Sequence, residues 1–215
     1  MADREEYLAE PYQTAAQQRE ASFLGMWLFL ATEIMMFGVL FLVIYYYRLQ
    51  HPAAVGEAVH HLHSILAGVN SVLLLTGSLC MSLMVQASRL GNYRRVQQFL
   101  LLTAFFGLAF LAVKFFEYGW EYREGLLPGI GPESPLKTVA GQLFMNIYFF
   151  ATALHAVHVT IAVVIVLGMV VRIHFAHMKL PERAITLEMV GLYWHLVDVI
   201  WIFLYPSLYL VGRAA

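Results

Sequence analysis

Five long, continuous apolar stretches dominate this sequence. They cover residues 22–47, 64–88, 96–120, 141–171 and 187–211. A helix needs about 20 apolar residues to cross the hydrocarbon core of a bilayer, and each stretch reaches that length. Lipid offers the backbone no hydrogen-bond partners, so only helices and closed barrels span it, and barrel strands alternate over segments of about ten residues. The sequence therefore predicts an all-α, polytopic membrane bundle of five transmembrane helices.

The composition supports this fold class and excludes others. Hydrophobic residues make up 60% of the 215 residues and charged residues only 13%, which is far from the balance of a soluble domain. The net charge of −1 argues against a nucleic-acid-binding protein. Cys80 is the single cysteine, so no internal disulfide is expected.

The distribution of positive residues predicts the orientation. Eight Lys and Arg residues flank the predicted spans on the N-terminal side and four on the opposite side, with Lys114 inside the third span. The positive-inside rule then places the N-terminus in the cytoplasm, and five spans place the C-terminus outside. We expect a cytoplasmic tail over residues 1–21 and a single transmembrane domain over residues 22–215. The eight inner residues are Arg4, Arg19, Arg89, Arg94, Arg95, Arg172, Lys179 and Arg183, and the four outer ones are Arg48, Arg123, Lys137 and Arg213.

Ionisable residues at membrane depth are the candidate functional residues. An acidic or basic side chain near the bilayer centre costs roughly 2.5–3.5 kcal/mol on insertion scales, so such residues face protein and have a role. Glu33 and Asp198 each lie about 16 Å into their spans at a rise of about 1.5 Å per residue. His155 and His158, like His195 and Asp198, are three residues apart and share a helix face. We expect these five residues to form a buried polar network.

The residue chemistry leaves two interpretations of this network open. Neutral imidazole is a common metal or haem ligand, and axial haem ligands can come from facing helices in a bundle. The interpretation that we favour is a hydrogen-bonded core without metal. Glu33 is either a proton carrier or a structural carboxyl, because apolar surroundings disfavour its charged form.

Two further groups of ionisable residues lie near the outer ends of the spans. Lys114 and Glu117 are three residues apart, and we expect an interfacial pair that anchors the end of the third span. The first outer loop contains His51, His60, His61 and His63, which we interpret as a solvated loop rather than a metal site.

Three motifs resemble subunit III of the haem-copper respiratory oxidases, the cytochrome c oxidase and quinol oxidase group. The first is Trp27-Leu-Phe-Leu-Ala-Thr-Glu-Ile-Met-Met-Phe37, which contains Glu33. The second is Phe149-Phe-Ala-Thr-Ala-Leu-His-Ala-Val-His-Val159, and the third is Tyr193-Trp-His-Leu-Val-Asp-Val-Ile-Trp-Ile-Phe-Leu204. The resemblance extends over nearly the whole chain after the N-terminal tail.

This resemblance implies a non-catalytic subunit of a proton-pumping terminal oxidase in a prokaryotic inner membrane. It implies that the chain holds no haem, copper or other metal, that haem and copper lie in partner subunits, and that structural phospholipid is bound. The implied partners are subunit I as the main contact, subunit II and other oxidase subunits. Glu33 corresponds to the buried carboxyl of the family, with a role in proton uptake and stability of subunit I. His155, His158, His195, Asp198 and Glu117 correspond to its typical polar residues.

The best-known family members have seven spans, whereas this chain resembles a five-span form without the first pair. Within the family, a quinol oxidase subunit III and an accessory of nitric oxide reductase remain alternatives. A small proton or ion transporter is an alternative of another class, although the sequence shows no repeated halves. A membrane cytochrome that binds haem through the buried histidines is a third alternative.

Overall fold

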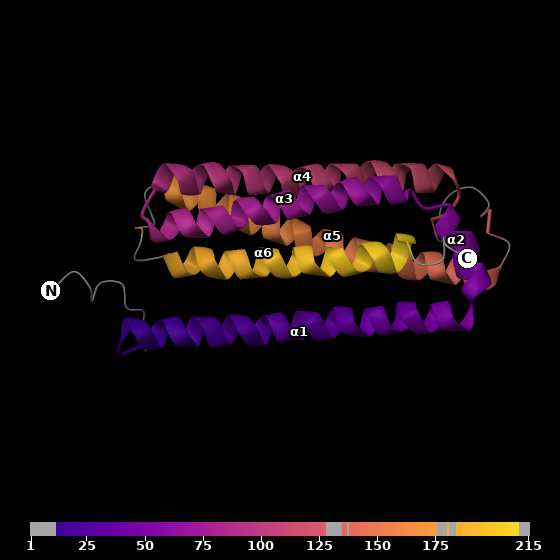
Figure 1. The fold of residues 1–215 in the computed structure, drawn as a ribbon, viewed down its shortest axis with the longest axis horizontal. Helices are drawn as coiled ribbons and strands as arrows, with labels where there is room; N and C mark the ends of the chain where they lie inside the picture. Colours follow the sequence, from indigo (N-terminus) through magenta and orange to yellow (C-terminus); the bar gives the residue numbers. More distant parts are fainter. Residues whose placement is uncertain (1–11, 128–134, 137, 176–179, 181–183, 211–215) are drawn as a thin grey trace.

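The structure, a computed structural model, is an all-helical bundle and describes residues 12–127, 135–136, 138–175, 180 and 184–210 (Figure 1). Within these residues, five helices are long and apolar enough to cross a membrane. These helices contain the five predicted spans, and most of the helices are longer than the spans predicted for them. Position 211 of the last predicted span and residues 1–11 of the predicted tail lie outside the described residues. The helices are α1 (Ala15–Gln50), α2 (Pro52–His60), α3 (Ser64–Arg89), α4 (Tyr93–Arg123), α5 (Val139–His174) and α6 (Ala184–Tyr205), followed by a π-helical turn, η2 (Pro206–Leu210).

The helices α3, α4, α5 and α6 form a four-helix bundle, and α1 lies along its side (Figure 1). Successive long helices run in opposite directions, so α1 begins at one end of the bundle and η2 lies at the other (Figure 1). α1 packs against α6 and α5. Its 36 residues give a length of about 54 Å, so its ends extend beyond a hydrocarbon core of about 30 Å.

Polar caps define where three of the long helices begin. The side chains of Thr14, Asn92 and Thr138 accept hydrogen bonds from the backbone N–H groups of Gln17, Arg95 and Gly141 at 3.1–3.2 Å. Each cap satisfies a donor that the first helical turn leaves unpaired.

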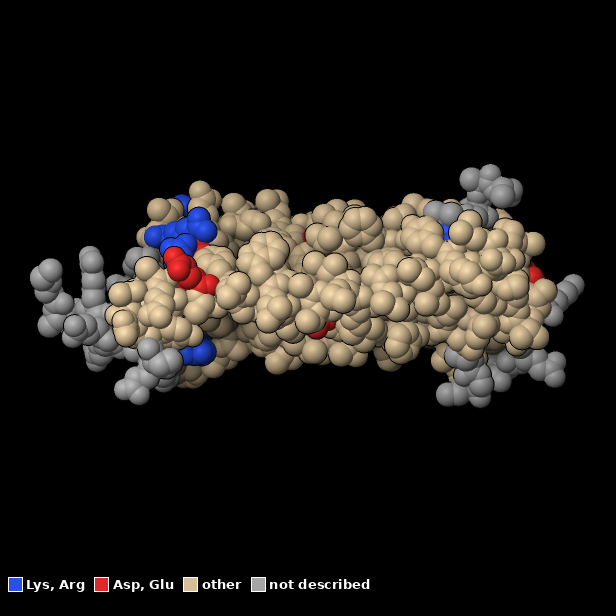
Figure 2. Space-filling model, turned by 90° about the horizontal axis from the view of Figure 1, so that it is seen from below, with Lys and Arg blue, Asp and Glu red and all other residues tan. Residues whose placement is uncertain are grey.

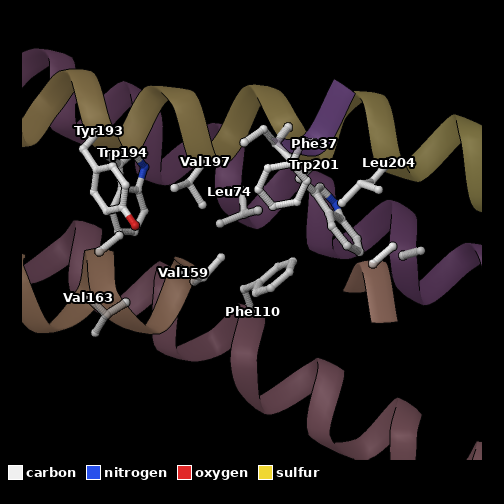
Figure 3. Packing of buried hydrophobic residues seen from close by; sticks show 14 of the residues in the cluster. Phe37, Leu74, Phe110, Val159, Val163, Tyr193, Trp194, Val197, Trp201 and Leu204 are labelled. Atoms are coloured by element: carbon white, nitrogen blue, oxygen red, sulfur yellow. The ribbon is translucent and has the colours of Figure 1, made fainter. Parts of the chain in front are cut away.

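Two tryptophans of α6 occupy the centre of the bundle (Figure 3). The ring of Trp194 packs on Gly77 of α3 and Gly107 of α4, and a Cβ at Gly107 would lie only 2.9 Å from its Cη2 atom. Trp201 is fully buried and meets the ring of Phe110 edge-on at 5.0 Å between centroids. Small residues on α3 and α4 thus allow the bulky residues of α6 to fit between these helices.

Two short elements at the end of the bundle opposite the start of α1 were not predicted (Figure 1). The first outer loop contains α2, whose residues Val55, Ala58 and Val59 are buried, so this loop is packed rather than fully solvated. After Tyr205 the last helix changes to the π-helical turn η2. Pro206 lacks the N–H for an α-helical hydrogen bond, which explains where the change occurs.

On the face drawn in Figure 2, charged residues gather toward the two ends and the middle is nearly free of them. At the end where α1 begins, Glu188 of α6 pairs with Arg89 at 2.8 Å and with Arg19 at 3.6 Å. The long sides carry exposed apolar residues, as a surface in contact with lipid does. Of the positive residues used to predict the orientation, Arg4, Lys137, Lys179, Arg183 and Arg213 lie outside the described residues.

Candidate functional site

The structure places the candidate residues in separate polar sites instead of one network. Glu33 and His158 form one site, and His195 belongs to a second between α3 and α6. Lys114 and Glu117 belong to a third site near η2. Each site lies between a different set of elements, namely α1 and α5, α3 and α6, and α4, α5 and η2.

Glu33 of α1 and His158 of α5 form a bridge between these helices. Oε2 of Glu33 lies 2.9 Å from Nε2 of His158, and 16% and 12% of the two side chains are exposed. His158 Nδ1 lies 2.8 Å from the carbonyl oxygen of Leu154, which accepts only, so Nδ1 carries a proton. The contact at Nε2 therefore needs a second proton, held by either the carboxyl or the imidazole. The bridge holds one shared proton, and it is partly exposed at the side of the bundle.

His195 lies between α6 and α3. Its Nδ1 atom is 2.9 Å from the hydroxyl of Ser78, and its Nε2 atom is 3.4 Å from that of Ser82. Asp198, one turn further along α6, is 4% exposed, and its Oδ1 atom has no hydrogen-bond partner among the described residues. Two serines of α3, Ser78 and Ser82, thus hold the histidine where the two helices pack together.

His155 is fully buried but is held by aromatic rings. Its ring stacks on Trp201 at 5.1 Å between centroids, and it meets Phe110 edge-on at 5.5 Å. Neither ring nitrogen has a hydrogen-bond partner in the described part of the chain. His155 therefore packs in the aromatic core of the bundle, and not within the polar network that we expected.

Lys114 and Glu117 lie inside the bundle, whereas the sequence predicted a pair at the membrane interface. Nζ of Lys114 is 2.9 Å from Oε2 of Glu117, and the two side chains are 3% and 0% exposed. The reason is that Tyr148 of α5 and Tyr209 of η2 offer polar partners in the interior. Tyr209 accepts a hydrogen bond from Lys114 at 2.9 Å and donates one to Glu117 at 2.8 Å.

Aromatic rings surround the ammonium group of Lys114. It lies 5.0 Å from the ring centroid of Tyr118 and 5.5 Å from those of Tyr148 and Trp201. The ring of Tyr209 is 5.6 Å away. Electron-rich ring faces stabilise a desolvated cation, so the rings and Glu117 together make burial of this lysine tolerable.

Lys114 and Glu117 form a buried cluster with Glu121, Tyr148 and Tyr209, which we call the outer polar cluster. The sequence analysis missed the last three of these residues. Glu121, Tyr148 and Tyr209 are at most 1% exposed, and the hydroxyl of Tyr148 lies 2.7 Å from Oε1 of Glu121. The signal for Glu121 was its spacing, because residues 114, 117 and 121 lie on one helix face. The two tyrosines gave no comparable signal, since tyrosine is common at membrane interfaces.

The polar sites therefore differ in what chemistry they can perform. The Glu33–His158 bridge and the outer polar cluster combine proton donors and acceptors at hydrogen-bond distance, which suits them to hold protons. Within the described residues, no group of three or more His, Cys, Asp or Glu side chains is arranged to hold a metal ion.

Comparison with known proteins gives a match to one family over nearly the whole chain. The family model described as cytochrome c oxidase subunit III matches residues 9–213. A protein of Synechocystis named cytochrome c oxidase subunit 3 is 30% identical over 87% of this chain and 74% of its own length.

Other relatives carry different names. A probable quinol oxidase subunit 3 of Staphylococcus epidermidis is 26% identical over 95% of this chain and 96% of its own length. A haem-copper oxidase subunit I+III of Aeropyrum pernix is 28% identical over 87% of this chain, which spans only 22% of that longer protein. The similarity thus includes proteins named for both kinds of electron donor.

Proposed function

This chain belongs to the cytochrome c oxidase subunit III family, and we propose that it is the accessory subunit III of an oxygen-reducing, proton-pumping haem-copper oxidase. The observation that carries the proposal is the family match over residues 9–213, which includes all five candidate membrane spans. The chain is a multi-pass membrane protein, and the proposed location is the plasma membrane of a prokaryote.

The proposed main partner is subunit I of the oxidase. The Aeropyrum relative is named subunit I+III, and this chain matches 22% of it. Two subunits joined in one polypeptide are expected to lie side by side in the membrane, because the joining segment limits their separation. Subunit II and structural phospholipid complete the proposed surroundings, and the exposed apolar sides of the bundle offer area for both protein and lipid contacts.

We assign haem and copper to the partner subunits. The described histidines support this assignment by their surroundings: His155 is enclosed by Trp201 and Phe110, and His195 is bound to serine hydroxyls. His158 is occupied by Glu33 and by the carbonyl of Leu154. The contribution of this chain is then to stabilise subunit I and to assist its proton uptake, with Glu33 as the residue that we assign to this role.

The proposed electron donor is cytochrome c, with quinol as the second candidate. The Synechocystis relative supports cytochrome c by its name. Relatives of Staphylococcus epidermidis and Bacillus subtilis, named as probable quinol oxidase and quinol oxidase subunits 3, support quinol because their matches extend over 93–96% of their length. The two donors predict the same role for this chain.

The experiment is purification of the tagged chain from its host in mild detergent. We expect haem and copper in the visible spectrum and by metal analysis, and two larger oxidase subunits by mass spectrometry. An untagged strain is the control for adventitious binding. Oxygen consumption with reduced cytochrome c or with quinol then identifies the donor. A colourless chain that purifies without other subunits would contradict the proposal and favour a transporter or an independent accessory protein.

A further inference from the structure

The outer polar cluster contains more short hydrogen-bond contacts than its protons can fill when both glutamates are ionised. Its members are Lys114, Glu117, Glu121, Tyr148 and Tyr209. α4 contributes the lysine and both glutamates, α5 contributes Tyr148, and η2 contributes Tyr209. All five residues are at most 2% exposed. Buried polar atoms need hydrogen-bond partners, so the protons in this cluster can be counted.

Three short oxygen–oxygen contacts run in a chain through the cluster. Oε1 of Glu121 is 2.7 Å from the Tyr148 hydroxyl, and that hydroxyl is 2.7 Å from the hydroxyl of Tyr209. The Tyr209 hydroxyl is in turn 2.8 Å from Oε1 of Glu117. Oxygens at such distances have a proton between them, so the chain requires three protons.

The two tyrosine hydroxyls supply only two of these three protons. The ammonium of Lys114 does not supply the third, because its three hydrogens point to Oε2 of Glu117 at 2.9 Å, Tyr209 at 2.9 Å and Tyr148 at 3.4 Å. A deprotonated tyrosine would increase the deficit. We propose that the carboxyl group of Glu121 is a proton-binding site and donates its proton to Tyr148 in the folded protein.

This assignment satisfies the whole chain of contacts. Glu121 donates to Tyr148, Tyr148 donates to Tyr209, and Tyr209 donates to Glu117. Both tyrosine oxygens then accept from Lys114 as well, within their capacity for two hydrogen bonds. The longer contact of 3.3 Å between Tyr148 and Glu117 is a secondary one.

The proton belongs on Glu121 and not on Glu117 because of their different surroundings. Glu117 touches the ammonium of Lys114 and accepts from Tyr209, so its ionised form is stabilised on both oxygens. Oε2 of Glu121 is buried and has no hydrogen-bond partner among the described residues. An unpaired carboxylate oxygen in the interior is costly, whereas the carbonyl oxygen of a neutral carboxyl group is less so.

Charge balance agrees with the proton count. With Glu121 neutral, the cluster contains one ammonium and one carboxylate in direct contact. With both glutamates ionised, a net negative charge would be enclosed within the bundle, because Lys114 balances only one of them. The cluster therefore holds one proton in an enclosed site that the function proposed above does not require.

Infrared difference spectroscopy of the intact complex tests this proposal. The difference between wild type and Glu121→Gln is expected to contain the C=O stretch of a protonated carboxyl group at neutral pH. Glu33→Gln is the matched control, because Glu33 is another carboxyl at membrane depth. Since the Glu33 side chain is partly exposed, its difference band is expected to respond to reagents that reach the protein from the lipid. A spectrum in which Glu121→Gln removes only carboxylate bands would overturn the proposal.

Thermal stability gives an independent readout. Glutamine has the shape and the donor capacity of a protonated glutamic acid, so Glu121→Gln is expected to leave the melting temperature of the complex nearly unchanged. Glu117→Gln removes the anion beside Lys114, and we expect a loss of roughly 5–10 °C. Two outcomes would place the proton on Glu117 and overturn the assignment. In the first, Glu121→Gln lowers the melting temperature more than Glu117→Gln does; in the second, the Glu117→Gln complex assembles and the Glu121→Gln complex does not.

Discussion

The Glu33–His158 bridge and the outer polar cluster hold ionisable groups in the same bundle by different means. The bridge is a single contact of 2.9 Å between α1 and α5, and both side chains remain partly exposed. The cluster encloses Lys114, Glu117 and Glu121 completely and joins them to tyrosines from two other elements. Both sites contain a proton that the hydrogen-bond geometry requires.

The difference shows how a membrane bundle separates stability from access. In the cluster, every charge has several partners, so removing one leaves others buried and unpaired. At the bridge, either partner can turn toward lipid, water or a neighbouring subunit when the contact breaks. We therefore expect the cluster to stabilise the fold and the bridge to act in function, and the changes below test that division.

The largest effect is expected from Lys114→Ala. The change removes the cation from the cluster and leaves Glu117 buried without its cationic partner, at a cost of about 3–5 kcal/mol. Subunit retention after detergent extraction and the melting temperature of the complex measure this cost. The comparison fails if Glu33→Ala reduces stability as much as Lys114→Ala does.

Gly107→Ala tests the packing of the inner helices. A Cβ there would lie 2.9 Å from Trp194 and closer still to Val163, so we expect destabilisation of about 1–3 kcal/mol. Gly38→Ala on α1 is the matched control, because no atom lies within 4 Å of its Cβ position, and it is expected to be neutral or slightly stabilising. Equal losses in thermal stability for both variants would show that α1 packs as tightly as the inner helices.

Glu33→Ala is expected to have a small effect on stability and a larger one on function. Hydrogen bonds between membrane helices contribute on average about 0.6 kcal/mol, so the complex should assemble normally. We expect faster loss of oxidase activity during turnover, measured as the decay of oxygen consumption with time. An inactivation rate equal to that of wild type would contradict a role of Glu33 in proton uptake or stability during turnover.

The smallest effect is expected from Arg19→Ala. Arg19 ties α1 to Glu188 of α6 across 3.6 Å with 60% of its side chain exposed, and exposed ion pairs contribute about 0.2–1 kcal/mol. The loss should disappear at high salt, because salt screens exposed charges. Melting curves at low and high ionic strength measure it, and Arg19→Lys is the control that keeps the charge.

The spans and the burial of polar residues could be predicted from the sequence because both follow from composition along the chain. Apolar runs of sufficient length mark the helices, and His155 or Asp198 within such a run must face protein. The grouping of these residues could not be predicted, because it depends on rotation and height of each helix relative to its neighbours. His158 therefore pairs with Glu33, whereas His155, one turn away, packs on Trp201.

The position of Tyr209 had no signal in the sequence for a related reason. Its side chain reaches Lys114 from η2, and hydrophobic periodicity does not reveal a π-helical turn. Lys114 was expected at the interface because a long cation near a helix end usually extends there. The partner that instead draws it inward is 95 residues away in sequence.

The π-helical turn makes the outer polar cluster sensitive to chain length as well as to side-chain identity. In an α-helix each residue turns the chain by about 100°, so removing one residue between Pro206 and Tyr209 would rotate the tyrosine away from Lys114 without changing any atom of the cluster itself. A π-turn has the residue count of an α-helical turn with one insertion. Related chains that differ by a single residue at this turn would then differ in whether they enclose the lysine at all.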